Sequence, residues 1–261
     1  MGASTRASLE TLRSQVASVA ASVELVSGVC IVGRAIAQHP SLLQALADQG
    51  HSADERVALL NGALKSAPSD VRDVVALVVT QSWSKPGDLL AGVEELAVRL
   101  ASMASDSADV TGELLQAGRA IRGHSDLQLA MSDKRAQSED KMAVVEKLFA
   151  KKISAGALEL TKHLVALPRG RRVSDALSQA ASIVADQQGV GLAEVRVASA
   201  LAAAQESSLR ETLQKRFGRD HYLDVVVDPE VIGGVRIRVG DVVIDASVIK
   251  QLSDMRIQLA S

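Results

Sequence analysis

The sequence has very few aromatic residues: one Trp, one Tyr and two Phe among 261 residues, although 47% of the chain is hydrophobic. Its cores must therefore be built mainly from Ala, Val and Leu, a composition that suits closely packed helices better than an aromatic-rich β-sandwich. Proteins that bind single-stranded nucleic acid stack bases on aromatic rings, so the scarcity of rings argues against that class. The composition predicts a mainly helical protein that does not bind nucleic acid.

An excess of charge of one sign is also missing, since 29 Lys and Arg face 31 Asp and Glu for a formal net charge of -2. No global field draws the chain to nucleic acid or anionic lipid, which leaves other proteins as the expected partners. Cys30 is the single cysteine, so no intramolecular disulfide can form, as in a reducing cytoplasm. Charged residues within positions 1–20 and apolar runs below spanning length predict a chain that is neither exported nor inserted in a membrane.

Motifs for catalysis, cofactors or metals are not found. The five histidines never occur at three- or four-residue spacing, so they do not predict a metal site. Gly189-Val190-Gly191 lacks the third glycine of a dinucleotide-binding loop, and we interpret it as a linker. The basic run at 168–172 is short and isolated, which favours a solvated turn over a phosphate site. We therefore expect no catalytic residue, no cofactor and no metal.

From Ser4 to about Gln188, apolar residues recur at the spacing of amphipathic helices. Two stretches, Ser52 to Glu55 and Ser125 to Gln128, match the capping pattern that satisfies free amides at a helix start. The region up to position 188 is predicted to be nearly all helix.

The helical region repeats itself with a period of 85 residues. Nine of the twenty-eight positions in 33–60 are identical to their counterparts in 118–145, where composition alone gives roughly two or three. After a one-residue slip the match resumes with Val93 opposite Leu177. We predict two tandem helical bundles, at 1–106 and 107–188; the alternative is a chance likeness between Ala-rich amphipathic helices.

The last part of the chain, 189–261, has a different pattern and predicts a small α/β domain. Residues 235–239 alternate strictly between apolar and basic, Gly240-Asp241 offers a two-residue hairpin turn, and 242–244 continue as a second strand. Asp245 or Ser247 is expected to cap a final helix at about 248–259.

The hairpin region resembles the C-terminal signature of the ATP synthase delta subunit family, which includes the oligomycin-sensitivity-conferring protein of organelles. The likeness runs from about Thr161 to the end of the chain. In its most specific part, 225–247, the signature positions are Gly233, Gly234, Gly240, Asp241, Asp245 and Ser247. Ala246 departs from the family's glycine, the chain is longer than the common form, and the family's aromatic opening helix is absent from 4–20.

The resemblance implies a non-catalytic stator subunit of the F-type ATP synthase. Its helical domain is expected to bind the N-terminal helices of alpha subunits on the catalytic head, and its C-terminal domain to hold subunit b of the peripheral stalk. The protein would then lie peripherally at the cytoplasmic face of the cell membrane and resist rotary torque during proton-driven ATP synthesis. Such a role demands stiffness and slow dissociation rather than chemistry.

One helix in the first bundle is unusually apolar and leads us to expect that this bundle binds alpha, although the sequence leaves either copy open. The candidate partner-binding residues are Val71, Val74, Val75, Val78 and Val79. Trp83, which follows them, is either core or an interface anchor. The alternative function is a helical adaptor of another membrane-associated complex, and an enzyme would require a concave polar pocket.

Overall fold

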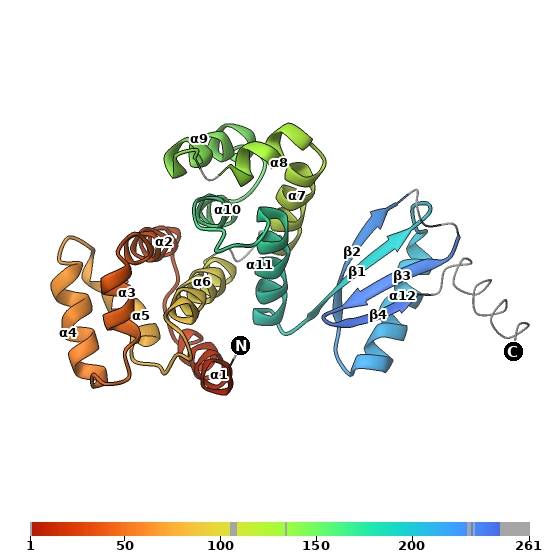
Figure 1. The fold of residues 1–261 in the computed structure, drawn as a ribbon. Helices are drawn as coiled ribbons and strands as arrows, with labels where there is room; N and C mark the ends of the chain where they lie inside the picture. The colour runs from red at the N-terminus through yellow and green to blue at the C-terminus, as the bar shows by residue number, and fades with distance from the viewer. Residues whose placement is uncertain (1, 105–108, 134, 229–230, 232, 246–261) are drawn as a thin grey trace, which may run out of the picture. The chain divides into compact units, whose positions relative to one another are not determined.

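The computed structural model describes all residues except 1, 105–108, 134, 229–230, 232 and 246–261. The described residues form twelve helices and four strands, which confirms a mainly helical protein with a small α/β C-terminal domain (Figure 1). They divide into two compact units, a helical unit at 1–184 and a sheet unit at 185–261. The predicted final helix and Ser247 lie outside the described residues.

Eleven helices follow one another along the first part of the chain. They are α1 (Ala3–Val16), α2 (Val23–Gln38), α3 (Pro40–Ala47), α4 (Ala53–Ala63), α5 (Ser69–Val79), α6 (Pro86–Met103), α7 (Val110–Arg122), α8 (Ser125–Ser132), α9 (Ser138–Phe149), α10 (Ala155–Ala166) and α11 (Val173–Gln187).

Several helix starts follow from local hydrogen bonding. Ser52 and Glu55 form the predicted capping box, in which the Ser52 side chain accepts from the Glu55 amide and Glu55 accepts from the Ser52 amide at 2.8 Å. The equivalent prediction at Ser125 is wrong, because α8 already begins at Ser125 and its N-cap, His124, makes no side-chain cap. A serine-to-glutamine spacing alone did not reveal that the helix starts one residue earlier.

The helices recur in the same order at nearly constant spacing. Helices α1 to α5 start at residues 3, 23, 40, 53 and 69, and α6 to α10 start at 86, 110, 125, 138 and 155. Their packing recurs too, since α2 contacts α3 and α5 as α7 contacts α8 and α10, and α4 contacts α5 as α9 contacts α10. Because α11 follows α10 as α6 follows α5, α6 is both the sixth helix of the first series and the first helix of the second.

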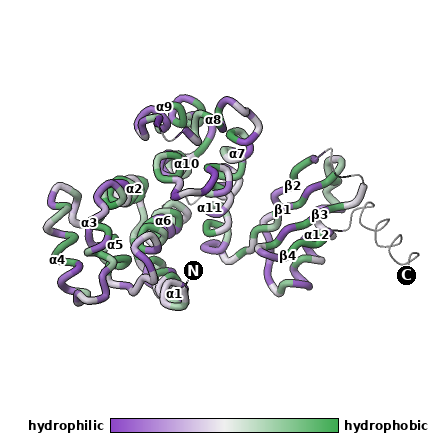
Figure 2. The backbone as a smooth tube through the Cα atoms, viewed as in Figure 1, coloured by the Kyte–Doolittle hydropathy of each residue, from purple (hydrophilic) through white to green (hydrophobic). Residues whose placement is uncertain are grey.

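Helix α6 therefore serves two bundles, which we call the first bundle (α1 to α6) and the second bundle (α6 to α11). It packs against α1, α2, α3 and α5 on one side of the predicted boundary at 106/107, and against α10 on the other. The division of the helices into 1–106 and 107–188 stays a prediction. Figure 2 shows α6 mostly in the hydrophobic colour, as expected of a helix with neighbours on several sides.

The core of the helical unit is built from Leu, Val and Ala, as the composition predicts. Trp83 belongs to this core: it is 4% exposed and its indole Nε1 donates to the Val78 carbonyl at 2.9 Å. Gly92 of α6 lies under the ring, where an added Cβ would be 2.4 Å from Trp83 Cη2. Of the two roles considered for Trp83, the structure supports core packing.

The sheet unit contains β1 (Gly191–Val197), α12 (Ala203–Phe217), β2 (His221–Val227), β3 (Val235–Val239) and β4 (Val242–Asp245). The strand order is β2-β1-β3-β4, with β1 parallel to β2 and the other pairs antiparallel. Alternate residues of the strands, among them Ala193, Val195 and Ile237, form a core with Leu213 of α12. One face of the sheet is thus packed against α12.

The predicted hairpin between β3 and β4 is confirmed. Val239 pairs with Val242, so Gly240 and Asp241 are the two loop residues. Gly240 has φ +56°, which a residue with a side chain rarely adopts.

Candidate interaction surfaces

The valines proposed as partner-binding residues lie on α5, and four of the five point into the helical unit. Val71 is 2% exposed, and Val75, Val78 and Val79 are fully buried. Only Val74 is half-buried. An apolar run in the sequence does not distinguish a core face from an interface, because both need the same side chains. The binding role of α5 stays a prediction, and four of its valines are already occupied in this structure.

The sequence led us to expect a solvated turn at the basic run 168–172, and this expectation is wrong. Arg169 Nε lies 3.2 Å and Arg171 Nη2 lies 2.6 Å from the same oxygen of Glu94, whose side chain is 4% exposed. The two arginine side chains are only 18% and 22% exposed. Burial is the largest influence on Arg169 and lowers its pKa, which the nearby Glu94 opposes. We call these three residues the Glu94 cluster.

The backbone of this turn is unusual. Arg169 is the one residue other than glycine with a positive φ among the described residues, at +50°, and Gly170 follows at +78°. Such a conformation costs free energy at a residue with a side chain and persists where surrounding contacts hold it. The contact with Glu94 from α6 supplies that constraint. Sequence reasoning missed the cluster because its members are more than seventy positions apart.

Two other titratable side chains are buried near α2 and α10. Burial raises the pKa of Cys30 to about 12, so the thiol stays protonated. Burial also lowers the pKa of His163 to about 4, so this imidazole is neutral near pH 7. No group of three or more potential metal ligands occurs within the described residues. Both side chains are parts of the core.

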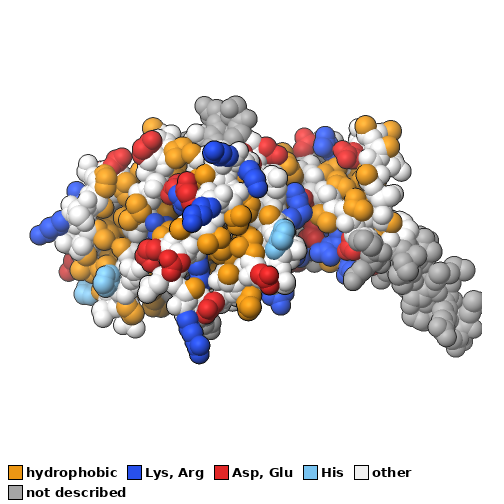
Figure 3. Space-filling view, turned by 90° about the horizontal axis from the view of Figure 1, so that it is seen from above, with side chains coloured by type: hydrophobic (Ala, Val, Ile, Leu, Met, Phe, Trp, Pro, Cys, Tyr) orange, Lys and Arg blue, Asp and Glu red, His pale blue; other side chains and the backbone are white. Residues whose placement is uncertain are grey.

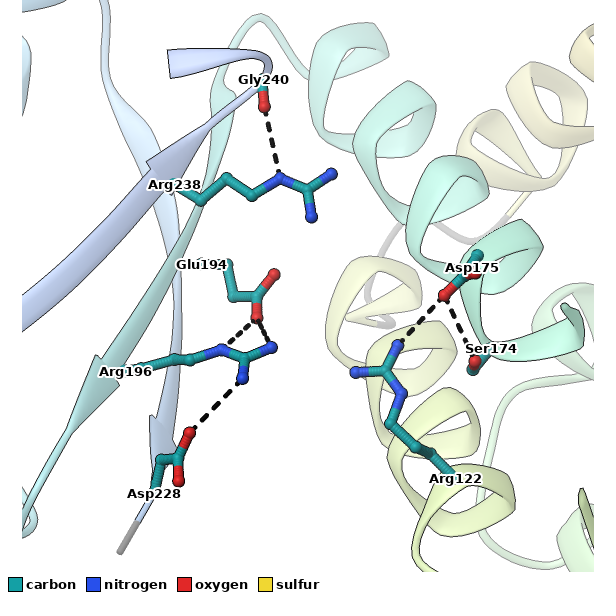
Figure 4. Close-up of polar contacts among 8 residues, drawn as sticks. All are labelled: Arg122, Ser174, Asp175, Glu194, Arg196, Asp228, Arg238 and Gly240. Carbon is teal, nitrogen blue, oxygen red and sulfur yellow. Dashed lines mark hydrogen bonds and ion pairs between the residues drawn. The ribbon is translucent and has the colours of Figure 1, made fainter. Parts of the chain in front are cut away.

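The helical unit also exposes single apolar side chains among charged ones, as Figure 3 shows for one of its faces. Leu129 of α8 is 73% exposed and Ile31 of α2 is 55% exposed. Surface charges there are paired across helices, for example Arg122 with Asp175 at 3.4 Å (Figure 4). These positions could not be recognised as exposed from the sequence, because an apolar residue at helical spacing fits a core position equally well.

Five of the six family-signature residues can be placed in the sheet unit. Gly233, Gly234 and Gly240 all have positive φ, between +56° and +78°, which explains why glycine is needed at each. Asp241 is exposed in the hairpin loop, and Asp245 ends β4 opposite Arg236. The three glycines thus have a conformational role in this part of the chain.

The face of the sheet that points away from α12 carries charged side chains in cross-strand rows. One row runs Asp224, Glu194, Arg238 and Val243, and the next runs Val226, Arg196, Arg236 and Asp245. We call this surface the charged sheet face.

Ion pairs tie part of this face together (Figure 4). Arg196 pairs with Glu194 at 2.8 Å and with Asp228 at 3.4 Å, and these contacts raise its pKa. Arg236 reaches Asp245 only at 3.9 Å, and Arg238 contacts the Gly240 carbonyl at 3.4 Å. Arg196 and Arg236 are direct cross-strand neighbours, an arrangement of like charges that does not favour the isolated sheet. A shallow pocket of about 200 Å³ is lined by Glu194 and the three arginines together with Val243.

The fold and the exposed residues define a class of protein. It is mainly helical, consists of two units, and exposes apolar and charged side chains on both of them. Among the described helices, none combines the length and hydropathy needed to cross a bilayer. A model of the family described as "ATP synthase delta (OSCP) subunit" matches residues 97–259. The match begins within α6 and covers the rest of the second bundle and nearly all of the sheet unit.

Curated proteins named "ATP synthase subunit delta" are similar over a still longer range. The protein from Leifsonia xyli is 34% identical over 263 aligned positions that cover all of both chains. The one from Thermobifida fusca is 36% identical over 85% of each chain. A chain of the Toxoplasma gondii mitochondrial ATP synthase hexamer aligns with 64% of this chain and 97% of its own length at 19% identity, with a TM-score of 0.39.

The chain belongs to the ATP synthase delta (OSCP) subunit family, stator components of the F-type ATP synthase. The resemblance noted in the sequence is thereby confirmed, and the full-length match to the Leifsonia protein shows that a relative shares the extended form.

Proposed function

We propose that this protein is the non-catalytic link between the alpha/beta head of an F-type ATP synthase and subunit b of the peripheral stalk. The helical unit would hold the N-terminal helices of alpha subunits, and the sheet unit would hold subunit b. Membership of the delta subunit family supports a role in binding rather than chemistry. The chain would lie peripherally at the cytoplasmic face of the cell membrane.

The charged sheet face is the observation that carries the assignment of subunit b to the sheet unit. The face opposite to it is already packed against α12. Arg236 and Arg238 are exposed and have at most a distant carboxylate among the described residues. A helix that brings acidic side chains to these arginines would relieve the like-charge contact with Arg196 and form charge-assisted hydrogen bonds.

The test measures binding of the full-length chain to the soluble part of subunit b. Arg236→Glu and Arg238→Glu together should weaken binding by about tenfold or more and reduce its dependence on salt. Arg210→Glu is the matched control, because Arg210 is an exposed arginine on α12. Equal effects of both changes, or no effect of the first, would contradict this assignment.

A further inference from the structure

One contact in the second bundle has no counterpart in the first. Helix α2 packs against α10 as well as against α6. The Ser27 hydroxyl donates to Glu159 of α10 at 3.2 Å. Gly33 lies where α2, α6 and α10 meet, since an added Cβ there would be 2.9 Å from Val93 and 3.3 Å from His163. The backbone of α2 thus rests directly on both helices of the second bundle.

This contact buries one face of α10. Counted from the first residue of α10, the fifth, sixth and ninth positions are Glu159, Leu160 and His163. Leu160 is fully buried, His163 is 1% exposed and Glu159 is half-buried. Residues spaced in this way lie on one side of a helix, and α2 packs against this side at Glu159 and His163.

The equivalent face of α5 is open. The fifth, sixth and ninth residues of α5 are Asp73, Val74 and Leu77, of which Asp73 is exposed and the other two are half-buried. Asp70, one turn earlier on the same side, is exposed as well. Among the described helices, α5 packs mainly against α4, α6 and α2, with a smaller contact to α1, and these contacts leave the three positions at least partly exposed.

We infer that α2 is a built-in occupant of the helix-binding face of the second bundle, and that the free face is the one on α5 in the first bundle. The inference rests on the proposed function, because it takes the partner to be an N-terminal helix of an alpha subunit. The chain then has one free site for such a helix, not two.

The open face also indicates the chemistry of its occupant. Val74 and Leu77 would pack against the apolar stripe of an amphipathic helix. In the contact of α2 with α10, the small residue Gly33 allows the two helices to approach closely, so a small residue is also expected in the partner helix. Asp70 and Asp73 flank the apolar pair and call for Lys or Arg beside that stripe. Val74 is the one residue of the predicted valine set that belongs to this surface.

The experiment titrates the full-length chain with a labelled peptide of the cognate alpha N-terminal segment. Leu77→Asp should weaken binding about tenfold or more, and Asp73→Lys, which changes only an exposed side chain, should weaken it severalfold. Leu129→Asp, at an exposed apolar position of the second bundle, should leave affinity within twofold of the parent chain. Circular dichroism checks that each variant is folded.

A second arm asks whether α2 must leave α10 for binding to occur. Ser27→Cys and Glu159→Cys, introduced with Cys30→Ser, allow α2 to be cross-linked to α10 by a short reagent. Unchanged affinity after cross-linking supports the inference. Lost affinity, or insensitivity to both Leu77→Asp and Asp73→Lys, overturns it. Failure of the parent chain to bind the peptide at all would instead overturn the proposed function.

Discussion

Glu94 offers a direct test of how α6 is held to the turn that follows α10. It lies on α6, whereas Arg169 and Arg171 come from the turn after α10, and one carboxylate oxygen serves both. Glu94→Gln keeps the shape of the side chain but removes its charge. Two partly buried guanidinium groups are then left without their counter-charge, and the φ of +50° at Arg169 loses the contact that holds it.

The size of the effect follows from the exposure of the three side chains. Removing one member of a fully buried ion pair costs about 3–5 kcal/mol. Arg169 and Arg171 keep 18% and 22% of their surface exposed, so water compensates part of the loss. We expect Glu94→Gln to lower the free energy of unfolding by about 2–3 kcal/mol, with a coupling of about 1–2 kcal/mol to Arg171→Gln in a double-mutant cycle.

Urea unfolding measures this loss, followed by circular dichroism and by the fluorescence of Trp83, the single Trp of the chain. Glu10→Gln is the control, since Glu10 is exposed on α1. If Glu94→Gln changes the free energy of unfolding by less than about 0.5 kcal/mol, as expected for a surface charge, the cluster does not stabilise the helical unit.

Three further predictions concern the packing of the helical unit. Gly92→Ala should lower the free energy of unfolding by about 1–3 kcal/mol because its methyl group meets the indole ring, whereas Gly87→Ala in the same helix, with open space around it, should be neutral or stabilising. His163 is neutral in the folded state down to its pKa of about 4 and takes up a proton on unfolding below about pH 6.5, so stability should fall by roughly 3 kcal/mol between those values. The urea midpoint of His163→Asn should fall less over that range. Cys30, fully buried with its pKa raised to about 12, should react with a thiol reagent only as fast as the unit opens, whereas Ile31→Cys with Cys30→Ser should react at once.

Each of these has a clear contrary result. Equal effects at Gly92 and Gly87 would mean that the indole moves aside without cost. A parent chain and a His163→Asn variant with the same pH dependence would mean that His163 is accessible to protons in the folded state. Prompt labelling of Cys30 without denaturant would mean that α2 opens readily from its neighbours.

Local patterns accounted for much of the fold. Helical spacing and the repeat of Gly33 to Ile36 at Gly118 to Ile121 indicated two related sets of helices, and alternation at 235–239 with Gly240 gave the hairpin. These features depend on neighbours a few residues apart, where period and turn chemistry determine the structure.

Contacts between distant segments were not predictable in this way. The link from Glu94 to Arg169 and the double use of α6 depend on how segments far apart in the sequence pack together, and no local spacing encodes either. The valines of α5 were predicted to bind a partner, although most of them are buried in the core, because burial by a distant helix cannot be predicted from local spacing. The half-buried Leu77, on which the proposed binding face depends, likewise looks ordinary in the sequence.

The double use of α6 has a mechanical consequence. A helix of 18 residues is about 27 Å long, and this one forms a wall of both bundles. A pull on the first bundle would therefore reach the second through the backbone of one continuous helix. Neither bundle can be cut away without opening the side of the other.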